Sequence, residues 1–223
     1  MIIKIDGFDS ISIPKGKVHV LMTDNQGVYF RIIQAMQGKT DALKIFDDSD
    51  NSISLTKGLI WDGDPITNEK WVQRGLRKLI KQFNEELFDN ERQFLASVMQ
   101  NAYSKVQESL FKYDLPLEVA NDNDCNRMLK YCHPHFPVMI NKSAYDIIST
   151  DIKLHEEIHD TAVIGMSNVA NYLTSEEFKN LIGLVSDEQI MLFLVMFSEK
   201  HNRNYYSDVD VTFIDDDFVE WHL

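Results

Sequence analysis

Cysteine is scarce in this chain, which has 223 residues and only two cysteines, Cys125 and Cys132. A small secreted fold held by several disulfides is therefore excluded. Long hydrophobic runs are missing too, because the longest, Ile190 to Phe197, is far shorter than the roughly 20 residues that span a bilayer. No apolar stretch of signal-peptide length follows Met1. We therefore expect a cytoplasmic protein with no membrane partner.

Positive charge is in the minority. The chain has 22 basic and 35 acidic residues, which gives a net charge of −13. A uniformly acidic protein repels nucleic acid, so any contact with DNA must use a local basic surface or bound cations. Hydrophobic residues make up 44% of the chain, which is enough for a sizeable core and argues against disorder.

The chain also lacks a complete P-loop, the glycine-rich turn that holds phosphate between a strand and a helix. Gly38, Lys39 and Thr40 supply the last three positions of that motif, but Ile33 stands where its first glycine belongs. Helix-like sequence precedes this segment and strand-like sequence follows it, which is the reverse of the order that the motif needs. We therefore do not expect ATP hydrolysis.

Strand-like sequence lies at both ends of the chain, and helix-like sequence fills its middle. Strands that alternate with helices predict an α/β fold with one mostly parallel sheet. The predicted head domain is discontinuous, residues 1–66 plus 136–223, and an inserted α-helical arm domain takes up residues 67–135. Within the head, Trp61 to Pro65 is predicted to be a turn and Ser143 to Asp160 a single helix.

The arm is predicted to be a helical hairpin. Apolar residues at helical spacing define two long helices that meet at a turn near residue 89. The apolar stripe of the second helix is Leu95, Val98, Ala102, Val106 and Leu110. A third helical stretch is predicted to start at Pro116 and to reach about Tyr131.

His155, Glu156 and His159 match the H-E-x-x-H motif, in which two histidines one helical turn apart bind zinc beside a glutamate that acts as general base. A zinc metallopeptidase that uses these three residues is the alternative function. The charged flanking residues Lys153 and Asp160 are unusual for a peptidase helix. Both histidines also fall on an apolar helical stripe, which favours packing against the sheet.

Four acidic residues crowd the far end of the arm without a Lys or Arg between them: Asp114, Glu118, Asp122 and Asp124. Carboxylates this close repel one another unless water or a hard cation lies between them. A Ca²⁺ site and a solvated acidic loop both fit this pattern, and the residues alone leave the two interpretations open.

Five basic residues lie on the face of the first arm helix opposite its apolar stripe: Lys70, Arg74, Arg77, Lys78 and Lys81. A row of positive side chains along a helix is a surface that can follow a phosphate backbone. An ordinary solvated helix face has the same pattern, so the stripe is a candidate DNA-binding surface.

A resemblance to a known family connects these features. It rests on four stretches: Ala42 to Asp48, Ser52 to Leu59, Gln82 to Glu85, and Tyr172 to Phe178. Over nearly its full length the chain resembles the small ring-forming adaptation protein of type II-A CRISPR systems, which holds ends of double-stranded DNA.

The resemblance implies a degenerate P-loop-like α/β head, an inserted helical leg and a non-enzymatic homotetramer that encloses double-stranded DNA. It also implies bound Ca²⁺ and a role in spacer acquisition for antiviral defence, with the CRISPR integrase complex and the effector nuclease as partners. Asp114 and Glu118 match the family's calcium ligands best, whereas Asp122 and Asp124 align only with a small gap.

Overall fold

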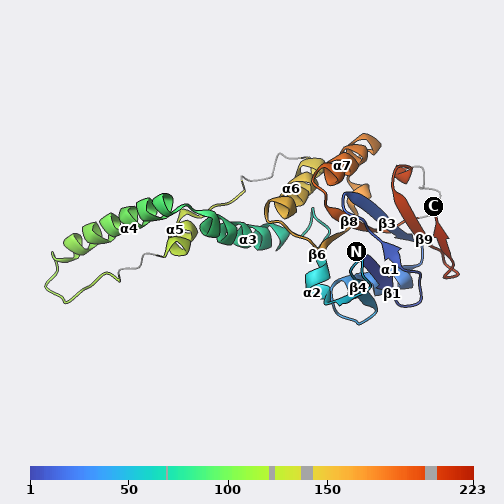
Figure 1. Cartoon of the computed structure of the whole chain (residues 1–223), viewed down its shortest axis with the longest axis horizontal. Coiled ribbons are helices and arrows are strands. Elements are labelled where there is room, and N and C mark those ends of the chain that lie inside the picture. The colour runs from blue at the N-terminus through green and yellow to red at the C-terminus, as the bar shows by residue number, and fades with distance from the viewer. Residues whose placement is uncertain (69, 121–123, 137–142, 199–204) are drawn as a thin grey trace. The chain divides into compact units, whose positions relative to one another are not determined.

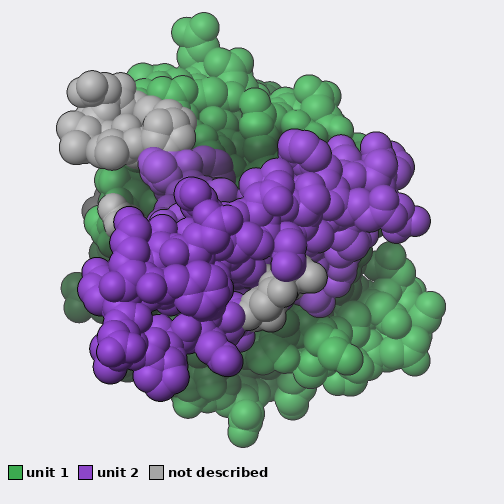
Figure 2. All heavy atoms as spheres, turned by 90° about the vertical axis from the view of Figure 1, so that its left-hand side faces the viewer, with its two compact units in different colours: residues 1–72, 138–223 green, residues 73–137 purple. Residues whose placement is uncertain are grey.

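The computed structural model describes residues 1–68, 70–120, 124–136, 143–198 and 205–223. The chain forms two compact units: unit 1 is Met1–Val72 with Val138–Leu223, and unit 2 is Gln73–Pro137 (Figure 2). The division into two compact units does not test whether each unit folds on its own, so the domain boundaries expected from the sequence stay a prediction. Every helix in the described ranges is too short or too polar to span a bilayer.

A six-stranded sheet forms the centre of unit 1, in the order β10-β9-β3-β8-β7-β6 (Figure 1). Its strands are β3 (Lys17–Thr23), β6 (Leu59–Gly63), β7 (Val163–Ser167), β8 (Met191–Phe197), β9 (Asp210–Ile214) and β10 (Glu220–His222). Neighbouring strands run parallel except β9 and β10, which confirms the predicted α/β fold. The turn expected at Trp61 to Pro65 is wrong in its first half, because Trp61 pairs with Gly165 of β7.

A second, smaller sheet is antiparallel and has the order β2-β1-β4-β5. Its strands are β1 (Ile2–Ile5), β2 (Ile11–Ser12), β4 (Leu43–Phe46) and β5 (Ser52–Ile53). The expectation of one sheet is therefore wrong. The pairing of β1 with β4 joins segments that are separated by β3 and a helix, so no local pattern indicates it.

The large sheet is buried on both faces. On one face it packs against α6 (Ala144–Glu157) and α7 (Ser175–Asp187), and on the other against α1 (Gln26–Met36) and the small sheet. Along β8, Leu192 and Leu194 belong to the first core, whereas Phe193 and Val195 belong to the second. Side chains alternate across a strand, so a strand between two apolar layers must be apolar at every position. Two short helical turns, α2 (Leu55–Gly58) and the 3₁₀ turn Val169–Asn171, complete unit 1.

Unit 2 contains most of α3 (Lys70–Glu86), all of α4 (Asp89–Leu110) and α5 (Cys125–Cys132). The third arm helix therefore starts at Cys125 and not at Pro116 as predicted. Gln107 of α4 binds the segment that precedes α5: its Nε2 donates to the Leu117 carbonyl at 3.0 Å, and its Oε1 accepts from the Val119 N–H at 2.7 Å.

Gly165 of β7 packs tightly against the indole ring of Trp61 on β6. A Cβ added to Gly165 would lie 2.7 Å from Trp61 Cε3, closer than atoms pack, whereas a Cβ added to Gly183 in α7 would have no atom within 4 Å. Gly165→Ala should lower the free energy of unfolding by about 1–3 kcal/mol through overpacking. Gly183→Ala, the matched control, should raise it by about 0.5–1 kcal/mol, because alanine is the better helix former.

Urea denaturation followed by circular dichroism measures both changes. Equal effects of the two substitutions would contradict the tight contact between Gly165 and the indole ring.

Candidate functional site

The predicted DNA-binding stripe lies on α3. Lys70, Arg77, Lys78 and Lys81 are exposed and Arg74 is half-buried. Two of the exposed side chains make local contacts: Lys81 pairs with Glu85 one turn away at 3.5 Å, and Arg77 Nε donates to the Gln73 carbonyl at 3.1 Å. Exposed pairs of this kind contribute little to stability, so their basic groups can exchange partners at low cost.

The two units differ in charge. Nine of the 22 basic residues and nine of the 35 acidic residues of the chain fall in unit 2, so the whole net charge of −13 lies on unit 1. Two stretches in or next to unit 2 carry charge of one sign. No acidic residue occurs from Lys70 to Asn84, whereas the predicted calcium ligands all lie between Asp114 and Asp124.

The structure places Asp114, Glu118 and Asp124 at exposed positions, and Asp122 lies outside the described residues. None of the three belongs to a described set of three His, Cys, Asp or Glu side chains whose ligand atoms lie within 4.8 Å of one another. The Ca²⁺ site therefore stays a prediction.

Unit 2 exposes an unusual amount of hydrophobic surface. Ten of the fifteen large hydrophobic side chains that are exposed in the described residues belong to it, and its buried hydrophobic side chains there are Met99 and Cys125. The apolar stripe predicted on α4 is open to solvent at Val98 and Val106, which are 40% and 50% exposed. So many exposed apolar side chains make unit 2 a candidate surface for contact with another protein.

The H-E-x-x-H geometry is absent. The helix that carries His155 ends at Glu157, two residues before His159 and three before the predicted end at Asp160. His159 has a left-handed backbone with φ of 51° and is exposed, whereas His155 is 2% exposed. The two imidazoles are therefore not one helical turn apart on a common face, and a zinc peptidase site does not form from these residues.

His155 instead forms the centre of a buried charge cluster, the His155 cluster, with Asp62, Asp151 and Asp160. Its Nδ1–H donates to Asp160 Oδ2 at 2.8 Å, and its Nε2–H donates to Asp62 Oδ2 at 3.0 Å. Asp151, one helical turn earlier, places Oδ1 at 3.4 Å from Nε2. Burial opposes the imidazolium charge, but the bonds with Asp151, Asp160 and Asp62 outweigh it and raise the pKa of His155 to about 11. The ring is thus charged at neutral pH, with both nitrogens engaged.

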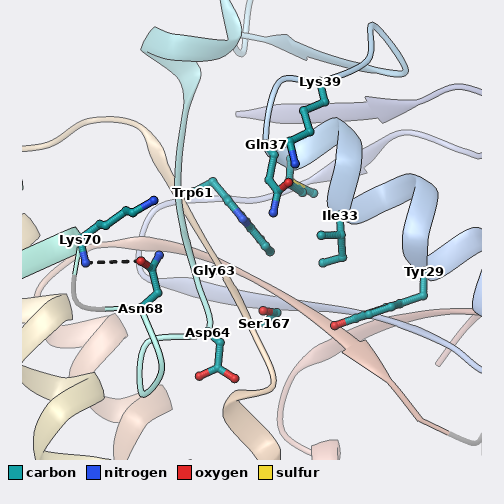
Figure 3. A pocket seen from close by; sticks show the side chains of 11 residues that line it. Tyr29, Ile33, Gln37, Lys39, Trp61, Gly63, Asp64, Asn68, Lys70 and Ser167 are labelled. Carbon is teal, nitrogen blue, oxygen red and sulfur yellow. Dashed lines mark hydrogen bonds between the residues drawn. The ribbon is translucent and has the colours of Figure 1, made fainter.

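A pocket of about 670 Å³ lies at the carboxyl ends of β6 and β7 in unit 1. Figure 3 shows the Trp61 indole between Lys39 and Lys70, with Asp64 and Ser167 below. Ligands of α/β folds bind at this edge of the sheet. Lys39, which the sequence assigned to a broken P-loop, therefore lies in the same pocket as Lys70 of the predicted stripe. The pocket thus combines two lysines, an indole ring and a carboxylate.

Asp64 forms the acidic side of this pocket. Its Oδ2 accepts from the Tyr172 hydroxyl at 2.7 Å and from Asn168 Nδ2 at 3.1 Å. Burial favours the neutral acid, but these bonds and those from the Ile66 and Thr67 N–H groups hold the pKa of Asp64 below its ordinary value. The hydrogen bond to Asp64 also raises the pKa of the Tyr172 hydroxyl to about 12. The carboxylate is therefore fixed in place and remains charged.

Removal of the central cation of the His155 cluster should strongly destabilise unit 1. His155→Gln leaves buried carboxylates without the imidazolium, a change that costs about 3–5 kcal/mol in buried ion pairs. Urea denaturation at pH 7 measures the loss. His159→Gln, which changes an exposed histidine four residues away, is the matched control and should change stability little.

The pH dependence distinguishes a charged His155 from a neutral packing residue. Since folding raises the pKa from 6.5 to about 11, the contribution of His155 is complete below pH 6.5 and is lost as the pH rises through about 11. The difference in unfolding free energy between the wild type and His155→Gln should therefore shrink from pH 7 to pH 10. A constant difference over this range would mean that the ring is neutral in the fold.

No protein-family model matches the chain, and no curated protein matches it by sequence. Among solved structures, the chain is similar to Stu0660 of Streptococcus thermophilus, with a TM-score of 0.63 and 12% identity over 100% of this chain and 76% of that one. Two ATP-binding cassettes of ABC transporters also match. MJ1267 in its ADP conformation has a TM-score of 0.48 and 14% identity over 95% of this chain and 84% of that one. A nucleotide-free cassette has a TM-score of 0.49 and 15% identity over 99% and 90%. At these identities the likeness to Stu0660 establishes the fold alone, and the two cassettes, with TM-scores below 0.5, carry no argument.

Proposed function

We propose that this protein is a non-enzymatic, ring-forming protein that binds ends of double-stranded DNA and assists spacer acquisition in CRISPR antiviral defence. The observation that carries the proposal is the basic face of α3, where Lys70, Arg77, Lys78 and Lys81 are exposed on a segment without acidic residues. In a chain with a net charge of −13, a local surface of this kind is what a phosphate backbone requires.

The hydrophobic surface of unit 2 supports assembly into a homotetramer. Its few buried apolar side chains give unit 2 a small core of its own, and its aromatic residues Phe88, Phe94 and Phe111 are 73%, 66% and 75% exposed. Each Å² of apolar surface that is buried against another copy of the chain contributes about 25 cal/mol to assembly. A closed ring satisfies each such surface without leaving an open end.

The CRISPR integrase complex and the effector nuclease are the proposed partners, and the resemblance stated above is what supports them. The proposal assigns no catalytic residue. The fold shared with Stu0660 is compatible with this function, but it is the charge pattern of α3 that makes DNA the proposed ligand.

Neutralisation of the stripe tests the DNA contact. The triple variant Arg77→Gln, Lys78→Gln, Lys81→Gln should bind linear duplex at least about tenfold more weakly. The slope of log affinity against log salt should fall by up to about three, since each phosphate contact contributes about 0.9. Gel shifts at several salt concentrations measure both quantities. Lys105→Gln with Lys112→Gln, which neutralises two exposed lysines outside the stripe, is the control and should keep the wild-type slope.

The same assay with covalently closed duplex tests threading. A ring loads from an end, so closed duplex should bind more weakly than linear duplex of the same sequence. Equal binding of both forms, or equal salt slopes for the stripe variant and its control, would contradict the proposal.

Calcium is tested separately on the acids at the end of the arm. If Ca²⁺ bridges Asp114 and Glu118 between copies, chelation should lower the melting temperature and shift the mass in solution from tetramer to smaller species. At a Ca²⁺ concentration 100 times the dissociation constant, the bound ion stabilises by about 2.7 kcal/mol. Light scattering and thermal melts with Ca²⁺ or EGTA measure the two effects.

The double variant Asp114→Asn, Glu118→Gln should not respond to Ca²⁺, whereas Glu108→Gln, an exposed acid on α4, should respond like the wild type. An equal response of both variants would remove Asp114 and Glu118 from the ligand set.

A further inference from the structure

Three metal-ligating side chains meet at the edge of the large sheet, far from the predicted calcium ligands in sequence. Glu220 and His222 lie on β10, next to the C terminus that Figure 1 marks beside β9. Residues two apart on a strand point to the same face, so both side chains project together. Asp9, in the turn between β1 and β2, completes the set, and the ligand atoms of the three residues lie within 4.8 Å of one another.

The spacing of these atoms is that of metal ligands rather than of hydrogen-bonded partners. His222 Nε2 lies 3.6 Å from Glu220 Oε1 and 3.7 Å from Asp9 Oδ2. Both distances exceed a side-chain hydrogen bond. Ligands of a tetrahedral ion with bonds of about 2.0–2.2 Å are separated by about 3.3–3.6 Å, so an ion between these atoms requires only a small inward movement.

Glu220 is already oriented for such an ion. Its Oε2 accepts from the Asp9 backbone N–H at 2.8 Å, which fixes the carboxylate. Its Oε1, the oxygen that faces His222, is buried and accepts no hydrogen bond from the described residues. A ligand carboxylate held through its second oxygen is the usual arrangement in metal sites. The side chain of Glu220 is only 13% exposed, although those of His222 and Asp9 are 61% and 81% exposed.

We propose that Asp9, Glu220 and His222 bind a divalent first-row transition metal ion such as Zn²⁺, with water in the remaining position. One imidazole nitrogen and two carboxylates form a donor set that Zn²⁺ accepts at four-coordination. Ca²⁺ takes six to eight oxygen ligands, so this site discriminates against it. The set is therefore chemically distinct from the acids predicted to bind Ca²⁺ in unit 2.

The His155 cluster contains the same residue types but is not a second site of this kind. Both nitrogens of its imidazole already lie within 3.0 Å of a carboxylate oxygen, and a protonated ring has no lone pair for a metal. At His222 the nearest carboxylate oxygens lie 3.6 and 3.7 Å from Nε2, beyond hydrogen-bond distance.

A bound ion would join the turn after β1 to the last strand of the chain, segments that are 211 residues apart at Asp9 and Glu220. It would therefore connect the small antiparallel sheet to the edge of the large one. A link between segments so far apart in sequence restricts the unfolded chain strongly and stabilises unit 1.

Titration of the metal-free full-length protein with ZnCl₂ in a calorimeter tests the proposal. We expect a site with one Zn²⁺ per chain, a rise of several degrees in the melting temperature, and no displacement by an excess of CaCl₂. CoCl₂ should produce the visible absorption of a four-coordinate Co²⁺ ion. Glu220→Gln and His222→Asn should each weaken Zn²⁺ binding at least about tenfold and remove the melting shift.

One control and one further ligand variant make the result decisive. His133→Asn removes an exposed histidine of unit 2 that neighbours Cys132, and this variant should keep the site if the ion lies on β10. Asp9→Asn, at an exposed turn position, provides a third ligand variant should either β10 variant fail to fold. Wild-type Zn²⁺ affinity in all ligand variants that fold, or loss of the site in His133→Asn, would overturn the proposal.

Discussion

The bond between His155 and Asp62 closes the base of the insertion that becomes unit 2. The chain leaves unit 1 shortly after β6, which carries Asp62, and returns shortly before α6, which carries His155. Bringing the ends of so long a segment together costs loop-closure entropy, and a buried charge-assisted bond offsets part of it. Because the imidazolium is shared among three carboxylates, α6 cannot move along the sheet without leaving buried charges uncompensated. The His155 cluster thus links β6 to α6, the two elements between which unit 2 is inserted.

Charge is distributed in a way that a single net value conceals. Unit 1 carries the whole of the net −13, and unit 2 is balanced, with four of its nine basic residues on α3 and four of its nine acidic residues between Asp114 and Asp124. Under the proposed function, DNA approaches the basic helix, and the acids require cations before copies of unit 2 can pack closely. The same opposite signs also allow the basic stretch of one copy to attract the acidic stretch of another. If the proposed function holds, salt acts on both DNA binding and assembly, and each must be measured at several ionic strengths.

The sequence predicted those parts of the fold in which the signal is local. The helix-like sequence noted before Gly38 is α1, Gln26–Met36, and the longest hydrophobic run, Ile190 to Phe197, is apolar throughout because β8 is buried on both faces. The strand around Trp61 was missed because Gly63 and Pro65 suggest a turn, although the pairing with Gly165 decides the conformation. The pairing of β1 with β4 joins distant segments, and local periodicity does not contain that information. The H-E-x-x-H motif predicted a zinc site that does not form, because helix α6 ends at Glu157. Asp160, which lies beyond the end of the helix, accepts a hydrogen bond from one nitrogen of His155.

The two histidine–carboxylate clusters show why residue type alone does not identify a metal site. In the His155 cluster, three carboxylates surround a fully buried ring, and the shortest contacts are 2.8 and 3.0 Å, which favours a proton on each nitrogen. At His222, the two carboxylate oxygens lie 3.6 and 3.7 Å from Nε2, beyond hydrogen-bond distance, and a divalent ion at this position gains three ligands at once. A difference of less than 1 Å in spacing, together with burial, therefore separates a structural cation from a ligand set. Neither the spacing of these atoms nor their burial can be read from the sequence, because Asp62 lies 93 residues from His155 and Asp9 lies 211 residues from Glu220.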